Sequence, residues 1–163
     1  MPIPEWYCTM PSPVGELLLI GSERGLSGLW MEVRAHPPAE QERIHNPECF
    51  EPVRRQLDEY FNGTRREFDV KLDLRGTPFQ VEVWEALLRI RYGTTMSYGE
   101  LAADLRRPAA VRAVGAANGR NPVSIIVPCH RVIGSNGSLT GYGGGLDKKQ
   151  LLLQHEASQK SLF

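Results

Sequence analysis

The pair Cys129-His130, which follows the apolar run Ile126-Val127, combines two residue types that can carry out covalent chemistry. A thiol with an ordinary pKa of ~8.5 is mostly protonated at neutral pH, and a neighbouring base or positive charge raises the fraction of reactive thiolate. The pair therefore indicates a candidate nucleophile and its base. A buried structural thiol beside a hydrogen-bonded histidine explains the same residues, and this run alone does not decide between the two.

Strand geometry constrains how this pair can act. The apolar residues before Cys129 predict a strand that leads into it. Adjacent side chains of a strand point to opposite faces, so a direct contact between the Cys129 thiol and the His130 imidazole requires a bend in the backbone. A bridging water molecule is the alternative.

The other cysteines, Cys8 and Cys49, do not extend a metal-binding or disulfide pattern, because no C-x-x-C spacing occurs. Both have apolar neighbours, and we expect both to be core thiols. This cysteine usage is typical of the reducing cytoplasm.

The chain has no apolar stretch of ~18 residues and no secretory signal at residues 1–5, so we expect a cytoplasmic protein without a membrane span. We also expect no metal and no cofactor.

The net charge of zero is unevenly distributed over the 163 residues. Residues 1–75 hold nine basic and thirteen acidic side chains, whereas residues 76–163 hold ten and six. No carboxylate occurs between Leu105 and Leu146. A charge run is usually a solvated face, but a basic segment of this length indicates a surface that meets an anion, and the phosphate backbone of a nucleic acid is the usual partner.

Residues 1–75 are predicted to form a small domain with a three-stranded antiparallel sheet and one helix. Two apolar runs, 17–20 and 26–30, are separated by a glycine-bounded turn and predict a hairpin. Residues 68–74 alternate apolar and polar side chains as a strand does, and apolar residues at helical spacing predict a helix over 50–61. Arg75-Gly76 is expected to link this domain to the next.

Residues 76–163 are predicted to form a helical domain, so that the whole chain is of the α+β class. Thr77 and Ser97 each begin a capping box that opens a helix. The second helix, to about Arg106, and a third over 109–117 are joined by a tight turn, as in a helix-turn-helix with a wing-like loop after it. A last helix is expected from Asp147 to about Glu156.

The predicted third helix consists almost entirely of small residues, with Arg112 as its one long polar side chain. A helix that reads bases in the major groove needs several such side chains. A slim helix can instead enter the minor groove and push one side chain into the base stack. A small-residue helix packed inside the fold is the alternative interpretation.

Several motifs, in order over residues 77–157, closely resemble the O6-alkylguanine-DNA alkyltransferases, also called methylated-DNA–protein-cysteine methyltransferases. The motifs are Thr77-Pro78-Phe79-Gln80, Tyr92-Gly93, Ser97-Tyr98-Gly99-Glu100-Leu101-Ala102, Arg112-Ala113-Val114-Gly115, Ala117-Asn118-Gly119, Asn121-Pro122, Pro128-Cys129-His130-Arg131-Val132-Ile133-Gly134 and Leu139-Thr140-Gly141-Tyr142. The turn Ser12-Pro13-Val14-Gly15 also resembles the more variable N-terminal domain of that family.

The resemblance implies a single-turnover repair reaction on alkylated duplex DNA. Cys129 would take an alkyl group from guanine O6, and from thymine O4, after the base has been flipped out of the stack. It implies catalytic roles for Cys129, His130 (the base, acting through a water), Glu156 (which orients His130) and Asn121 (the hinge). It implies DNA contacts by Tyr98, Arg112 (the finger that replaces the flipped base), Arg106, Arg107 and Ser135. It implies a base pocket formed by Tyr98, Val132, Tyr142 and Gly143.

Departures from the family pattern are few. Arg106-Arg107 replaces a commoner glycine turn, Arg91 replaces a proline, and Gly143 lacks a hydroxyl that some relatives carry. The zinc-binding residues of some relatives have no counterparts. We expect no obligate protein partner, whereas cooperative assembly on DNA stays open. Two rivals remain: a helix-turn-helix protein that binds DNA without chemistry, and a cysteine hydrolase, for which no oxyanion-hole motif is recognisable.

Overall fold

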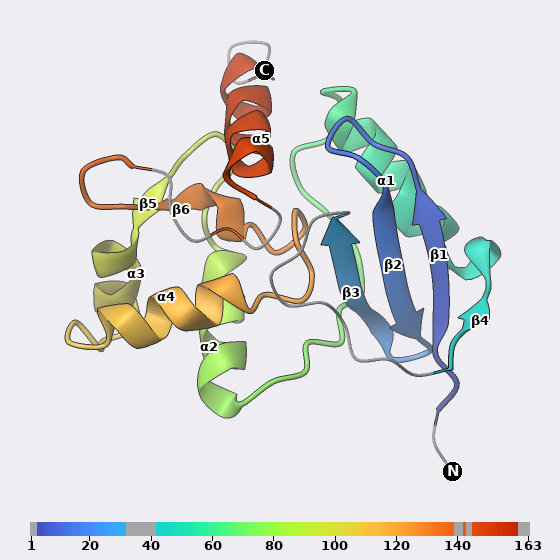
Figure 1. Ribbon diagram of the computed structural model, residues 1–163, viewed down its shortest axis with the longest axis horizontal. Helices are drawn as coiled ribbons and strands as arrows, with labels where there is room; N and C mark the ends of the chain where they lie inside the picture. Colours follow the sequence, from blue (N-terminus) through green and yellow to red (C-terminus); the bar gives the residue numbers. More distant parts are fainter. Residues whose placement is uncertain (1–2, 32–41, 139–141, 143–144, 160–163) are drawn as a thin grey trace.

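The computed structural model describes residues 3–31, 42–138, 142 and 145–159. Figure 1 shows a sheet with helix α1 beside it, and a second unit made of the remaining helices. The α+β class predicted from the sequence is confirmed. No helix in the described ranges is long and apolar enough to cross a membrane.

The first unit is a sheet of four strands, so the predicted three-stranded sheet is wrong. Its strands are β1 (Trp6–Met10), β2 (Leu17–Ser22), β3 (Gly25–Met31) and β4 (Ile44–His45), in the order β3-β2-β1-β4. The β2–β3 hairpin was predicted, and β1 joins it antiparallel. β4 pairs in parallel with β1 over two residues, too few for an alternating pattern to reveal.

Residues 68–74 are extended but form no named strand, contrary to the prediction. Leu26 pairs with Leu72 through an isolated bridge, in which the amide of Leu26 donates to Lys71 O (2.9 Å) and that of Asp73 donates to Leu26 O (2.8 Å). Apolar and polar side chains alternate here because only one side of the segment touches the edge of the sheet. Trp6–Met10 supplies the strand in its place.

Helix α1 (Glu51–Phe61), preceded by the 3-10 turn η1 (Pro47–Phe50), lies along the sheet (Figure 1). It buries Val53, Leu57 and Tyr60 in the core. Cys8 is buried as expected, but Cys49 is exposed and its thiol donates to Asn46 O. The prediction that Cys49 is a core thiol is therefore wrong, because η1 turns it outward at the start of the helix.

The second unit contains α2 (Pro78–Leu87), β5 (Met96–Ser97), α3 (Tyr98–Asp104), α4 (Val111–Gly119), the 3-10 turn η2 (Cys129–Arg131), β6 (Val132–Ile133) and α5 (Leu146–Gln159). Both predicted capping boxes are present, at Thr77 before α2 and at Ser97 before α3. β5 and β6 pair in parallel.

Helices α3 and α4 form the predicted helix-turn-helix. The turn between them places Arg106 at a φ of 60°, the left-handed region that glycine enters without steric cost. The amides of Arg106 and Arg107 donate to Ala103 O (2.9 Å) and Ala102 O (2.9 Å), which closes α3. The arginine pair thus forms the turn between the two helices.

The segment from Asn121 to Pro128 ties the second unit to the sheet. The amide of Leu29 donates to Pro122 O (2.8 Å), and that of Ser124 donates to Leu29 O (3.2 Å). No named strand precedes Cys129 in this described segment, so the strand predicted there is wrong. Its backbone groups bond to β3 and to nearby turns, and apolar composition alone does not distinguish such a segment from a strand.

Candidate active site

Cys129 is the first residue of η2 and is 4% exposed. Its amide donates to Val127 O (2.8 Å), and the amide of Arg131 donates to Pro128 O (3.0 Å). This tight turn is the bend that the sequence required. The side chains of Cys129 and His130 are therefore not forced to opposite faces of a strand.

Asn121, also buried, fixes the segment that leads to the thiol. Its side-chain amide donates to Val127 O (2.8 Å), while its oxygen accepts from the amide of Val123 (3.0 Å). A hydrogen bond from Asn121 also favours the thiolate of Cys129, which partly offsets the rise in the thiol pKa that burial causes. Asn121 thus contacts the thiol and sets the shape of the chain in front of it.

The adjacent residues His130 and Arg131 both bond to the carboxylate of Glu156, which lies 26 and 25 positions further along the chain. His130 Nε2 lies 2.7 Å from Glu156 Oε2, and Arg131 donates from Nε to Oε1 (2.8 Å) and from Nη2 to Oε2 (3.0 Å). Glu156 is 1% exposed and His130 is fully buried. The family resemblance, and no local pattern, singled out Glu156, and the structure places its carboxylate against His130.

The donors around Glu156 decide the protonation of this pair. Burial raises the pKa of the Glu156 carboxyl, but the contacts with His130 and Arg131 outweigh it and hold the pKa well below its usual range. An ionised carboxylate can only accept, so Nε2 of His130 carries the hydrogen. The lone pair is then on Nδ1, which is buried without a hydrogen-bond partner among the described residues.

Burial also controls the pKa of the two groups that would exchange a proton. Burial raises the pKa of the Cys129 thiol to about 11, against the opposing effects of Asn121 and Lys149. Burial lowers the pKa of His130 despite the carboxylate of Glu156. At neutral pH the site therefore holds a neutral thiol on Cys129 and, on the next residue of η2, a neutral imidazole with a free lone pair, which are the protonation states that general-base activation starts from.

Lys149 in α5 is a site residue that the sequence analysis missed. It is fully buried, and its Nζ donates to Val132 O (2.6 Å) and lies 5.8 Å from the ring centroid of Tyr98. Burial lowers its pKa to about 8, and its charge lowers the pKa of Cys129. Lys149, Leu152 and Glu156 are the buried residues of α5, and their helical spacing is the signal that could have revealed it.

The structure describes three of the four predicted base-pocket residues. Tyr98 is half-buried at the start of α3, Val132 is fully buried in β6, and Tyr142 is buried with its hydroxyl 3.9 Å from Met31 Sδ. Gly143 lies outside the described residues. Val132 and Tyr98 are brought near each other by the β5–β6 pair, which aligns Met96 with Val132 and Ser97 with Ile133.

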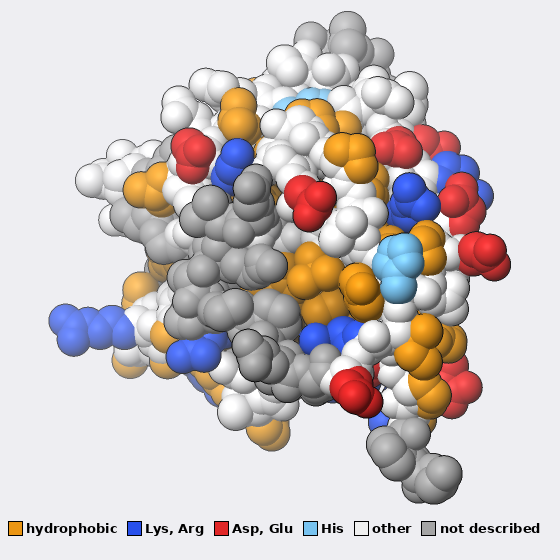
Figure 2. Space-filling view, turned by 45° about the vertical axis from the view of Figure 1, so that its right-hand side comes forward, with side chains coloured by type: hydrophobic (Ala, Val, Ile, Leu, Met, Phe, Trp, Pro, Cys, Tyr) orange, Lys and Arg blue, Asp and Glu red, His pale blue; other side chains and the backbone are white. Residues whose placement is uncertain are grey.

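Four of the five predicted DNA contacts lie on the exposed surface of the second unit, and the fifth, Tyr98, is half-buried. Arg106, Arg107, Arg112 and Ser135 are all exposed. Arg112 forms no ion pair or hydrogen bond with any described residue, whereas Arg107 contacts Glu82 (3.1 Å) and the ring of Phe79. In Figure 2, Lys and Arg side chains project at the lower left, the side where α3 and α4 lie in Figure 1, and most acidic side chains are on the opposite side.

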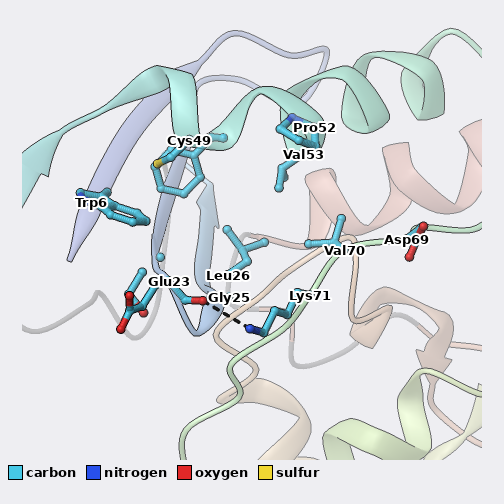
Figure 3. Close-up of a pocket in the computed structure, with 13 residues that line it drawn as sticks. Trp6, Glu23, Gly25, Leu26, Cys49, Pro52, Val53, Asp69, Val70 and Lys71 are labelled. Atoms are coloured by element: carbon cyan, nitrogen blue, oxygen red, sulfur yellow. Dashed lines mark hydrogen bonds between the residues drawn. The ribbon is translucent and has the colours of Figure 1, made fainter. Parts of the chain in front are cut away.

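The surface of the first unit is also hollowed, away from this site. A hollow of about 250 Å³ on the first unit is lined by Trp6, Cys49 and Lys71 among others, and Lys71 Nζ donates to Glu23 O there (Figure 3). It contains none of the predicted site residues. Within the described parts of the chain, no group of three or more His, Cys, Asp or Glu side chains could hold a metal ion.

The fold joins a helix-turn-helix to a buried cysteine, histidine and glutamate, an arrangement that indicates a DNA-binding protein. The chain belongs to the 6-O-methylguanine DNA methyltransferase family: the model of the family's DNA binding domain matches residues 78–158, and that of its ribonuclease-like domain matches residues 6–74. The resemblance stated from the motifs is thereby confirmed.

Similar proteins span nearly the whole chain. A methylated-DNA–protein-cysteine methyltransferase of Mycolicibacterium paratuberculosis is 50% identical over 161 residues, covering 96% of this chain and 98% of the relative. One from Methanosarcina acetivorans is 49% identical over 154 residues, covering 94% and 99%. The crystal structure of the Mycobacterium tuberculosis protein with DNA has a TM-score of 0.90 at 51% identity, covering 94% of each chain.

The effect of Lys149 on the thiol can be tested without DNA. In the Lys149→Met variant Cys129 loses a neighbouring positive charge, so we expect a higher thiol pKa and slower alkylation by iodoacetamide at pH 7, by roughly tenfold for each unit of pKa. Mass spectrometry measures the rate at Cys129, and Lys148→Met is the matched control. An unchanged rate in folded Lys149→Met protein would show that the charge of Lys149 does not act on the thiol.

Proposed function

We propose that Cys129 is the residue that takes an alkyl group from O6 of guanine in duplex DNA and retains it. The observation that carries this proposal is His130, whose Nε2 is bound to the ionised carboxylate of Glu156, in the same buried turn as the neutral thiol of Cys129. Family membership supplies the reaction class, and the geometry supplies groups in the protonation states that this reaction needs.

The proposed step balances without a cofactor. The thiol proton passes to Nδ1 of His130 through one water, and Glu156 stabilises the imidazolium that forms. The sulfur then attacks the alkyl carbon, so that the S–C bond forms as the C–O6 bond breaks. The guanine leaves with the electron pair of the C–O6 bond, and the proton held on His130 returns through the water to the departing base, so that guanine and imidazole both end neutral. The thioether that remains is stable, so each chain reacts once. Thymine O4 offers the same alkyl–oxygen bond, and we include it in the proposal.

Base flipping follows from the burial of the thiol, since guanine O6 in a stacked duplex cannot reach a sulfur that is 4% exposed. Arg112 is exposed on the small-residue helix α4, which suits it to occupy the gap left by the flipped base. Tyr98, Val132, Tyr142 and Gly143 would line the pocket for that base. Arg106, Arg107 and Ser135 would contact the phosphate backbone.

In this proposal the chain is a DNA-repair protein of the cytoplasm, where it associates with chromosomal DNA. The mycobacterial structure in complex with DNA supports DNA as the partner of this chain. The uneven charge of the two halves supports the same partner, because the basic half carries the helix-turn-helix.

Intact mass spectrometry after incubation with a duplex that contains O6-methylguanine tests the proposal. We expect one added methyl group per chain, located on Cys129, and none in the Cys129→Ser variant, because a serine hydroxyl is a poor nucleophile at its ordinary pKa. Cys49→Ser, which changes an exposed thiol, is the matched control and should react normally. Methylation of the Cys129→Ser protein would place the nucleophile elsewhere, and an unmodified wild-type chain would favour a binding protein without chemistry.

The role of Arg112 separates flipping from chemistry. We expect Arg112→Ala to slow the repair of a paired lesion more than the reaction with the free base O6-benzylguanine, because the free base needs no extrusion. Single-turnover rates with both substrates measure the difference, and Arg120→Ala, an exposed arginine after α4, is the control. Equal losses on the two substrates would mean that Arg112 acts on the pocket or the fold.

A further inference from the structure

Tyr60 of helix α1 reaches from the first unit of the fold to the carboxylate at the active site. Its hydroxyl donates to Glu156 Oε2 over 2.6 Å, and the whole side chain is buried. The two residues are 96 positions apart in the sequence. The unit that carries the sheet therefore supplies one of the donors on which Glu156 depends.

The ring of Tyr60 is held from several sides. Phe61 packs edge-on at 5.0 Å between ring centroids, Phe68 lies at 5.5 Å, and His155 of α5 lies at 5.0 Å. The imidazole Nε2 of His155 is 2.7 Å from the backbone oxygen of Tyr60, and because a carbonyl only accepts, that nitrogen donates. Contacts from both units thus fix the hydroxyl on Glu156.

Oxygen Oε2 of Glu156 is shared between three donors. They are the hydroxyl of Tyr60 (2.6 Å), Nε2 of His130 (2.7 Å) and Nη2 of Arg131 (3.0 Å). The three hydrogen bonds share the negative charge of this one carboxylate oxygen. The strength with which the oxygen holds His130 therefore depends on whether Tyr60 is bound to it.

We propose that Tyr60 is a positioning residue of the alkyl transfer, acting through Glu156 to orient His130 and to limit its basicity. The inference rests on the proposed role of His130 as the base. It gives the first unit a part in the reaction, because removal of one hydroxyl from α1 changes how readily the imidazole accepts the thiol proton.

The charges that face His130 give the direction of the effect. Glu156 raises the pKa of His130, whereas burial, Arg131 and Lys149 lower it. Burial and Glu156 raise the pKa of Tyr60 well above its ordinary value, so its hydroxyl stays a donor throughout the working pH range. Loss of that donor leaves more negative charge on Glu156 for His130, and the pKa of His130 rises.

The test compares Tyr60→Phe with Tyr92→Phe. Tyr92 packs edge-on against Tyr60 with ring centroids 6.1 Å apart, but its buried hydroxyl has no hydrogen-bond partner among the described residues. Each variant thus loses one buried phenolic oxygen from the same cluster, and only one of them loses a bond to Glu156. The titration of His130 is followed by NMR, and the pH dependence of the reaction with O6-benzylguanine by single-turnover kinetics.

We expect the His130 titration and the acidic limb of the rate profile to move upward in Tyr60→Phe by about 0.5 pH unit, a roughly threefold change in the protonation equilibrium. Tyr92→Phe should leave both in place. Fluorotyrosine incorporated at position 60 keeps the ring and donates more strongly, so it should move both downward, and it serves as the test if Tyr60→Phe does not fold.

Coincident titrations in wild type, Tyr60→Phe and the fluorotyrosine protein would overturn the proposal, as would equal shifts in the Tyr60 and Tyr92 variants. A lower melting temperature with an unmoved titration would assign Tyr60 to packing alone, which also contradicts it. The NMR arm does not depend on alkyl transfer. A wild-type chain that accepts no alkyl group would refute the proposed function. The NMR titration of His130 would still decide whether Tyr60 acts on His130.

Discussion

An ionised carboxylate in the interior of a protein is stable only where donors surround it, and the buried Glu156 meets this requirement with donors from both units. Its two oxygens accept from His130, from two nitrogens of Arg131 and from Tyr60. Arg131 also donates from Nη1 to Ile90 O (2.7 Å), which ties this group of residues to the end of α2. These bonds fix the imidazole of His130 on the carboxylate of Glu156.

Several contacts also hold the backbone that leads into Cys129. Ile125 adopts a φ of 72°, a conformation that a β-branched side chain takes only where its surroundings impose it. Asn121 on one side and the bonds to Leu29 of β3 on the other supply that constraint. The sheet and the helix-turn-helix thus meet at the segment that presents Cys129, so the first unit supports the reaction through β3 as well as through α1.

Local signals in the sequence predicted local structure well. The boxes at Thr77 and Ser97 and the hairpin of β2 and β3 depend on residues a few positions apart, and the structure confirms them. The two-residue strand β4, the extended segment 68–74 and the turn at Cys129 depend on partners far along the chain. Their apolar patterns could not show which backbone groups they would meet.

The site divides in the same way. The adjacency of Cys129 and His130 was visible in the sequence, and the family resemblance pointed to Glu156, but burial of that carboxylate is a property of the packed fold. Tyr60 has no local signature of function, because a tyrosine in an amphipathic helix is ordinary. Lys149 shows only a helical spacing with other residues of α5, which indicates a buried face and not a role in the site. Only the placement of α1 and α5 against η2 brings both side chains to the site.

The rate of methyl transfer from an O6-methylguanine duplex to the Glu156→Gln variant tests most directly whether this carboxylate organises the reaction. Glutamine preserves the shape but removes the charge that holds the imidazolium, so the account predicts a loss of roughly 10²–10⁴-fold in rate. It also predicts a free energy of unfolding lower by about 3–5 kcal/mol, because Arg131 loses its buried partner. A folded Glu156→Gln protein that transfers the methyl group at the wild-type rate would contradict the account.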